Sequence, residues 1–248
     1  ASSQGGSDAE PLRQAALDAL KTVSSSAQPA EHAALALTLP VLVTLGKAGV
    51  EAEDGGARAV PTAARISVFS ITRRLTTKLG PRLIPHIASL VPFCLSIVAR
   101  SASLAADSSD DEDETEKAVA AANGVNSNVS ALRTGALDTF TGLFGSVSTF
   151  MTSYVPQIIR MSISPELKQA MSSASGSSTA SERSLNLLLS ALIRKTPAKE
   201  LFEATFKVWD EELASAAYTK AERLTGISEF LGRALRQSDR EAISATYK

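Results

Sequence analysis

The chain has 248 residues, of which 44% are hydrophobic and 5% aromatic, and its net charge is −1. This length and apolar fraction suffice for a sizeable core, whereas the near-neutral charge excludes a protein that binds polyanions over its whole surface. Ala, Leu and Ser dominate the sequence. Ala and Leu are strong helix formers and strand-like alternation is hard to find, so the composition predicts an all-α protein.

A Ser/Gly-rich stretch, 1–8, is predicted to be a linker that precedes a helical repeat array over 9–248. In this array, apolar residues spaced three and four apart mark amphipathic helices. In chain order the predicted helices span 9–25, 29–47, 61–78, 81–101, 129–150, 152–171, 182–195, 197–215 and 218–237, and another begins near 239.

Several features interrupt this helical pattern. Pro40 lies inside the second predicted helix and Pro165 inside the sixth, where proline kinks or splits a helix. Acidic residues crowd an insertion over 105–117, which their charge predicts to be disordered. A Ser-rich loop is predicted over 172–181 and a further loop over 123–128.

A proline-containing segment occurs twice, each time between two long amphipathic stretches. It spans Leu79–Ile87, with Pro81 and Pro85, and Ser153–Ile159, with Pro156. Such a repeated break predicts antiparallel helix pairs, and the helices above give four pairs and part of a fifth. The expected fold is an α-solenoid of HEAT-like antiparallel helix hairpins, in which stacked neighbours bury a continuous core and present long surfaces to partners.

No catalytic or metal-binding motif is apparent. The sequence has no C-x-x-C, H-E-x-x-H, phosphate-loop or G-x-S-x-G pattern. His32 and His86 lack partners at ligand spacing, and Cys94, inside an apolar helix, is interpreted as a small core residue. We therefore expect a protein that is not an enzyme and has no cofactor, metal or small-molecule substrate.

No apolar run reaches the roughly 20 residues of a membrane span, so no membrane partner is expected. The chain lacks an initiator Met and stops inside a helix-like pattern at Lys248. We interpret it as a piece of a longer polypeptide.

Three groups of basic residues are the candidate sites for binding RNA or a protein partner. They are Arg73, Arg74, Lys78 and Arg82; Arg194, Lys195 and Lys199; and Arg233, Arg236 and Arg240. Two interpretations stay open. Cations near helix C-termini are favoured by the backbone dipole and serve as solvated caps, or the turns line one edge of the array and contact RNA phosphates or an acidic protein.

The acidic insertion contains two candidate phosphorylation sites. Ser108 and Ser109 each have an acidic residue three positions downstream, Asp111 and Glu112. This spacing fits acidophilic kinases such as casein kinase two, and phosphorylation would deepen the local negative charge. A plain solvated loop is the alternative.

The C-terminal third resembles a known family. The relevant stretches are LLLSALIRKTP over 187–197, LFEATFKVWD over 201–210 and ISEFLGRALRQSDR over 227–240. They resemble the U-three small nucleolar RNA-associated protein ten family, the very large HEAT-repeat protein of the small-subunit processome. In that family a similar stretch leads into the C-terminal domain, and Leu79–Val91 also looks like its repeat helices.

The resemblance implies a non-enzymatic scaffold in ribosome biogenesis, located in the nucleolus of the nucleus. The family belongs to the early-binding subcomplex that engages the 5′ external transcribed spacer of the ribosomal RNA precursor, and it is linked to transcription of rDNA. The implied partners are protein subunits of the processome and, within the larger assembly, pre-rRNA and the U3 snoRNP. The alternative is a segment of a nuclear transport receptor of the importin/exportin class, which is built from similar helix pairs.

Overall fold

The computed structural model describes residues 9–51, 62–107, 116–172, 178–215, 217 and 219–238. Within these ranges every regular element is helical, which confirms the all-α prediction. The α-helices are α1 (Ala9–Ser26), α2 (His32–Ala36), α3 (Leu39–Glu51), α4 (Thr62–Leu79), α5 (Ile87–Asp107), α6 (Glu116–Met151), α7 (Val155–Ile163), α8 (Pro165–Ser172), α9 (Ser178–Lys195), α10 (Ala198–Ala214) and α11 (Lys220–Gln237). Three 3₁₀ segments accompany them: η2 (Pro29–Glu31), η4 (Gly80–His86) and η5 (Thr152–Tyr154).

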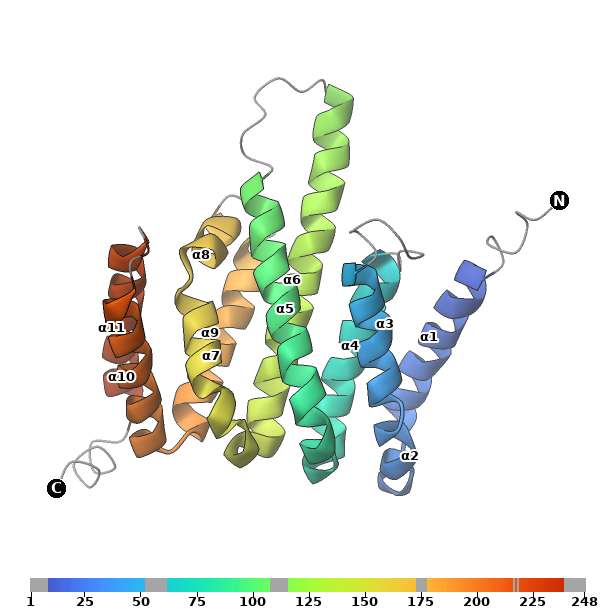
Figure 1. The fold of residues 1–248 in the computed structure, drawn as a ribbon. Coiled ribbons are helices and arrows are strands. Elements are labelled where there is room, and N and C mark those ends of the chain that lie inside the picture. Colours follow the sequence, from blue (N-terminus) through green and yellow to red (C-terminus); the bar gives the residue numbers. More distant parts are fainter. Residues whose placement is uncertain are drawn as a thin grey trace.

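The helices form two layers of an array that runs from one end of the chain to the other (Figure 1). The first layer contains α1, α4, α6, α9 and α11, each in contact with the next. The second layer contains α3, α5, the pair α7 and α8, and α10, again in contact with their neighbours. The chain alternates between the layers, as stacked antiparallel hairpins require, and this arrangement confirms the predicted HEAT-like α-solenoid.

Proline explains where the second helix of a hairpin begins. The segments η2, η4 and η5 stand directly before α2, α5 and α7, so the repeated proline cue marks the turn between the layers. Pro81 and Pro85 have no backbone N–H to donate, and η4 (Gly80–His86) therefore replaces the first six residues of the helix predicted over 81–101. All these turns lie along one edge of the array, the lower edge in Figure 1.

The two prolines inside predicted helices act as expected. Near Pro40 the chain bends by 42° between the segments Pro29–Ala36 and Leu39–Lys47. Ser164, directly before Pro165, is extended with ψ of 132° and separates α7 from α8.

Several predicted loop boundaries were wrong. Helix α6 begins at Glu116, so the predicted loop over 123–128 is helical, and only Val147 departs from helical dihedrals inside it. The acidic insertion is narrower than the predicted 105–117, because α5 continues to Asp107 and α6 starts at Glu116. The Ser-rich loop predicted over 172–181 is also narrower, because α9 includes 178–181. Low helix propensity of Asn, Gly and Ser is a weak signal that the continuation of an adjoining helix overrides.

Other predictions fall on residues that lie outside the described ranges. These are the linker over 1–8, the inner part of the acidic insertion over 108–115, the middle of the Ser-rich loop over 173–177 and the helix near 239. They stay predictions.

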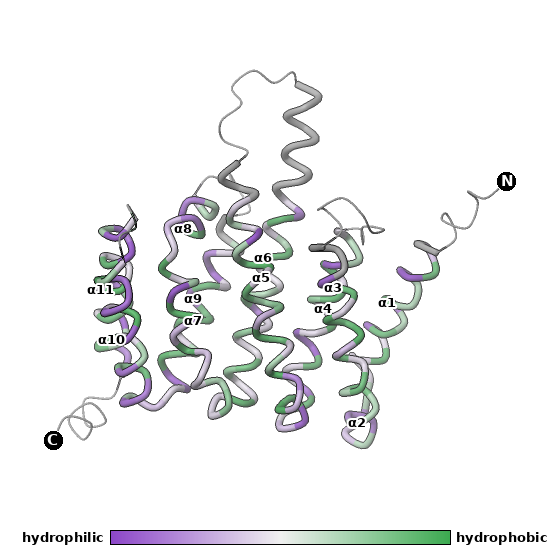
Figure 2. Tube along the Cα trace, in the orientation of Figure 1, coloured by the Kyte–Doolittle hydropathy of each residue, from purple (hydrophilic) through white to green (hydrophobic). Residues whose placement is uncertain are grey.

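The core between the layers contains an aromatic stack that two glycines make room for. Phe69 of α4 and Phe93 of α5 lie with ring centroids 5.0 Å apart and planes 2° from parallel. A Cβ on Gly135 of α6 would lie 2.7 Å from the Cβ of Phe69, and one on Gly46 of α3 would overlap the Phe93 ring. Apolar residues also recur at intervals along the other described helices (Figure 2).

Cys94 lies fully buried in α5, as the sequence predicted. Burial raises the pKa of its thiol, so the reactive thiolate is suppressed. We expect iodoacetamide to leave Cys94 unmodified in the folded chain at about pH 8 and to label it completely in denaturant, as measured by mass spectrometry. Labelling of the folded chain would show that α5 is not held in the core.

By length and composition, two membrane-span candidates occur among the described residues. One is Thr62–Ser103, with a mean hydropathy of 1.6 in its most apolar window, and the other is the bent pair Pro29–Ala36 and Leu39–Lys47. This differs from the expectation that no run is apolar enough. Thr62–Ser103 comprises α4, η4 and most of α5, and 44% of its most apolar window is buried in the array. Its apolar character is therefore explained by the core.

Candidate functional site

Three of the four residues in the first basic group bind the end of α1 and the turn after it. Lys78 donates to the carbonyl of Ser25 at 2.6 Å, and Arg74 donates to the hydroxyl of the same residue. Arg82 donates to the carbonyl of Pro29 at 3.2 Å. We call Arg74, Lys78 and Arg82 the α1 cap residues, since they bind the last turn of α1 and the turn after it; Lys78 satisfies a carbonyl at the negative end of the α1 dipole.

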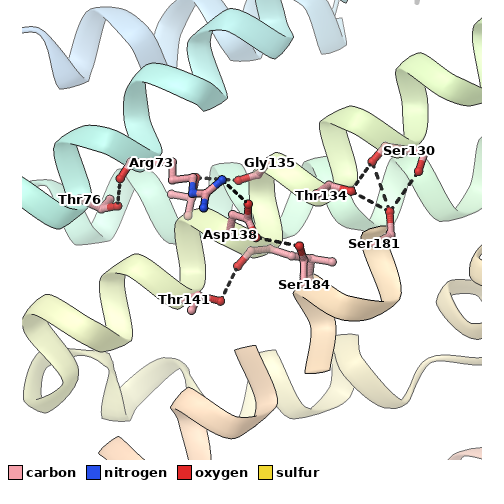
Figure 3. A network of polar contacts seen from close by, with 11 residues as sticks. Arg73, Thr76, Ser130, Thr134, Gly135, Asp138, Thr141, Ser181 and Ser184 are labelled. Atoms are coloured by element: carbon pink, nitrogen blue, oxygen red, sulfur yellow. Dashed lines mark hydrogen bonds and ion pairs between the residues drawn. The ribbon is translucent and has the colours of Figure 1, made fainter. Parts of the chain in front are cut away.

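The fourth member, Arg73, belongs to a polar network across the first layer (Figure 3). Its guanidinium lies 2.8 Å from the carboxylate of Asp138 on α6. Ser184 of α9 donates to the same carboxylate at 2.7 Å. One aspartate thus joins α4, α6 and α9.

Hydroxyl groups extend this network along α6 and α9. Ser181 lies 3.1 Å from the hydroxyl of Ser130 and 2.9 Å from that of Thr134. These contacts were not predicted, because isolated Ser and Thr on a helix ordinarily face solvent or bond to their own backbone.

An open groove of about 750 Å³ lies beside this network, between α4 and α6. Apolar Ile66 and Phe69 contribute to its lining, together with Arg73, Arg74 and hydroxyl-bearing residues such as Thr134. We call it the α4–α6 groove. Apolar surface surrounded by charged and hydroxyl groups is the usual composition of a surface that binds a protein segment.

A buried arginine connects α6 to the second layer. Arg133 is only 2% exposed. It donates to the hydroxyl and the carbonyl of Ser101 in α5, both at 3.2 Å, and to the carbonyl of Ala170 in α8 at 2.9 Å. Burial lowers the pKa of this guanidinium.

The second basic group lies where α9 turns into α10. Arg194 and Lys195 are exposed in the last turn of α9, and Lys199 lies 3.9 Å from Glu203 in an exposed pair. Such a pair contributes little to stability.

The third group divides into a packing residue and an exposed one. Arg233 of α11 donates to the side-chain oxygen of Asn186 at 2.7 Å, and to its carbonyl and the hydroxyl of Ser190 at 2.9 Å. Burial lowers the pKa of the Arg233 guanidinium. The contacts tie α11 to α9.

Exposed Arg236 lies one turn further along α11. Helices α9 and α11 both end at the lower edge in Figure 1, so Arg236 lies toward the same end of the array as Arg194 and Lys195. We call Arg194, Lys195 and Arg236 the basic end cluster. Arg240, Ser108 and Ser109 lie outside the described residues and stay predictions.

In the described part of the chain, no group of three or more His, Cys, Asp or Glu side chains is placed to hold a metal ion. The arrangement instead offers two exposed surfaces, the α4–α6 groove and the basic end cluster, on helices that polar side chains join to one another.

No family model matches the chain, and no solved structure matches it. The chain is 77% identical over 247 residues to U3 small nucleolar RNA-associated protein 10 of Mycosarcoma maydis. The match covers 98% of this chain and 11% of the relative, so the chain corresponds to a segment of a much longer protein. At this identity over nearly its whole length, the chain belongs to the U3 small nucleolar RNA-associated protein 10 family.

Proposed function

We propose that this chain is a non-enzymatic scaffold segment of a small-subunit processome component and acts in ribosome biogenesis. The observation that carries the proposal is the 77% identity to a relative named for its association with U3 small nucleolar RNA. Nucleolar location, pre-rRNA processing at the 5′ external transcribed spacer with the U3 snoRNP, and a link to rDNA transcription belong to the same proposal. The comparisons give no support to the transport-receptor alternative.

The geometry supports a scaffold because the polar side chains described above connect helices. Asp138 joins three helices of one layer, Arg133 joins the two layers, and Arg233 joins α11 to α9. Bonds of this kind fix the register between repeats. A fixed register keeps the exposed surfaces of successive hairpins at constant spacing, as a platform for assembly requires.

Two exposed surfaces take different partners in this proposal. The basic end cluster contacts RNA phosphates, since its three cations are exposed at neighbouring helix ends. The α4–α6 groove contacts a protein subunit of the processome. The net charge of −1 fits RNA contacts that are local and protein contacts that are more extensive.

The proposal is tested by affinity purification of the full-length protein together with RNA–protein crosslinking mapped to residues. We expect processome proteins and pre-rRNA to co-purify, with crosslinks near Arg194, Lys195 and Arg236. Enrichment of the GTPase Ran without processome proteins would overturn the scaffold proposal in favour of a transport receptor.

Reversing the charge of the basic end cluster is expected to weaken RNA binding. In the triple variant Arg194→Glu, Lys195→Glu and Arg236→Glu, the slope of log affinity against log salt for single-stranded RNA should become shallower by about 2, since each lost phosphate contact contributes about 0.7. Fluorescence anisotropy with a labelled oligonucleotide measures this.

The matched control reverses three exposed cations elsewhere, Lys47→Glu, Arg183→Glu and Lys207→Glu, with the same change in net charge. It should keep the original salt slope. Equal slopes for the two triple variants would show that only the overall charge matters and would remove the cluster from the site.

A further inference from the structure

The α4–α6 groove runs along about three turns of two parallel helices. Its lining spans positions 66–77 on α4 and 127–138 on α6. Both helices begin at the upper edge in Figure 1, and Arg73 of α4 is bonded to Asp138 of α6 near one end of the groove. From 66 to 77 an α-helix rises about 16 Å. A bound segment of similar length therefore fits between the two helices, where the ridge of a third helix would pack.

The two ends of this groove differ in chemistry. Ile66 of α4 and Ala131 of α6 line the end nearer the upper edge, and both side chains are at least partly exposed. Arg73, Arg74 and Thr77 line the other end. Because Ile66 and Arg73 are seven positions apart, they lie about two helical turns from each other on one side of α4. The groove thus offers an aliphatic half followed by a cationic half.

The cationic half retains hydrogen-bond donors for a ligand. Arg73 bonds to Asp138 at 2.8 Å through its Nη1 nitrogen, and 61% of its side chain is exposed. Since a guanidinium carries five N–H donors, part of the fork stays accessible. Asp138 is only 15% exposed and also accepts from Ser184, so its charge is balanced by Arg73. The half-buried Arg74, which donates to the hydroxyl of Ser25, then leaves this half with net positive charge.

The lining favours a protein segment over RNA. Unpaired bases bind by stacking on exposed aromatic rings. The aromatic side chain among the described lining residues, Phe69, is only 1% exposed and stacks on Phe93. The carboxylate of Asp138 also lies in the wall, where it would repel a chain that carries a charge on every phosphate. An acidic protein segment instead presents a few carboxylates, which can be placed at the arginines alone.

We propose that the α4–α6 groove binds an acidic amphipathic helix of another protein. This inference rests on the proposed function, in which the groove contacts a protein subunit of the processome, and it adds the chemistry of that contact. Apolar side chains of the bound helix pack on Ile66 and Ala131. An Asp or Glu about two turns along that helix bonds to Arg73 and Arg74, as charge complementarity requires.

Site-specific photocrosslinking in the full-length protein identifies the occupant. A benzophenone amino acid replaces Ser127, an exposed residue at the aliphatic end of the groove, and adducts formed in cells are sequenced by mass spectrometry. We expect an adduct with a protein of the processome, at a stretch that combines apolar residues with Asp or Glu at helical spacing. An adduct with RNA, or no adduct, would overturn the proposal.

Changing one exposed charge tests the chemistry of the contact. Thr77 lies at the cationic end, and its hydroxyl donates to the carbonyl of Arg74 within the same helix. A labelled synthetic peptide with the crosslinked sequence is titrated with the full-length protein by fluorescence anisotropy. Thr77→Lys should tighten binding about threefold and Thr77→Glu should weaken it about threefold, whereas a disturbance of folding would weaken binding in both variants. Replacing the acidic residue of the peptide by Lys should reverse this order.

Thr225 of α11 provides the matched control, because it is also exposed and its hydroxyl donates to a carbonyl of its own helix. Thr225→Lys and Thr225→Glu should leave the affinity unchanged. Equal affinities of the two Thr77 variants, or the same changes at Thr225, would overturn the groove assignment, and the scaffold proposal would stand if processome proteins still co-purify. Their absence from the purification would overturn the proposed function and this inference with it.

Discussion

Replacing Arg133 with Ala is expected to lower the free energy of unfolding by about 3 kcal/mol. The substitution removes the donor to the carbonyl of Ala170, which lies in the last turn of α8 and so lacks an intrahelical partner. It also removes both bonds to Ser101 and leaves a cavity between α5 and α6. Urea unfolding followed by circular dichroism measures the change.

Arg133→Lys separates the role of shape from that of charge. A lysine keeps the charge, but its single ammonium group does not reproduce the planar fork that bonds to α5 and α8 together. We expect it to restore less than half of the loss. Arg183→Ala, at an exposed position of α9, is the control and should change stability by less than about 0.5 kcal/mol. A similarly small effect of Arg133→Ala would show that the connection between the layers does not depend on this side chain.

Gly135→Ala is expected to destabilise the chain by about 2 kcal/mol, against the usual trend for a helix. Inside a helix, Ala is normally favoured over Gly by about 1 kcal/mol. Here the new Cβ would lie 2.7 Å from the Cβ of Phe69, an atom fixed by the backbone of α4. The stacked partner Phe93 prevents the Phe69 ring from moving away freely.

Gly145→Ala, in the same helix, is expected to stabilise the chain. Nothing lies within 4 Å of a Cβ built there, so the ordinary propensity gain of about 0.5–1 kcal/mol should appear. Thermal unfolding of the two variants side by side tests both signs. If both glycine variants raise the melting temperature, α4 and α6 pack less closely than described.

The sequence was sufficient for the hairpin order because that order depends on local signals. Apolar periodicity gave the existence of most helices, and prolines such as Pro81 and Pro165 gave their breaks. The start of α6 was missed because Asn123, Gly124 and Asn126 have low helix propensity, and propensity decides little once a helix is continued from a favourable neighbour.

The sequence predicted which basic residues make up the candidate site, but not which of them pack against other helices and which stay exposed. Arg233 and Arg236 look equivalent in the sequence, yet Arg233 bonds to Asn186 and Ser190 of α9 and Arg236 is exposed. Likewise Lys78 caps a residue 53 positions earlier in the chain. Such differences depend on the register between helices distant in sequence, which apolar periodicity does not specify.

Basic residues from distant parts of the chain share one long edge of the array. The α1 cap residues lie near the turn between α4 and α5, and the basic end cluster lies at the ends of α9 and α11; all of these helix ends follow the lower edge in Figure 1. Because the hairpins are stacked, this edge keeps the two groups of cations at a constant separation. A protein with a net charge of −1 thus has local positive charge along one edge, toward which an approaching nucleic acid would be attracted.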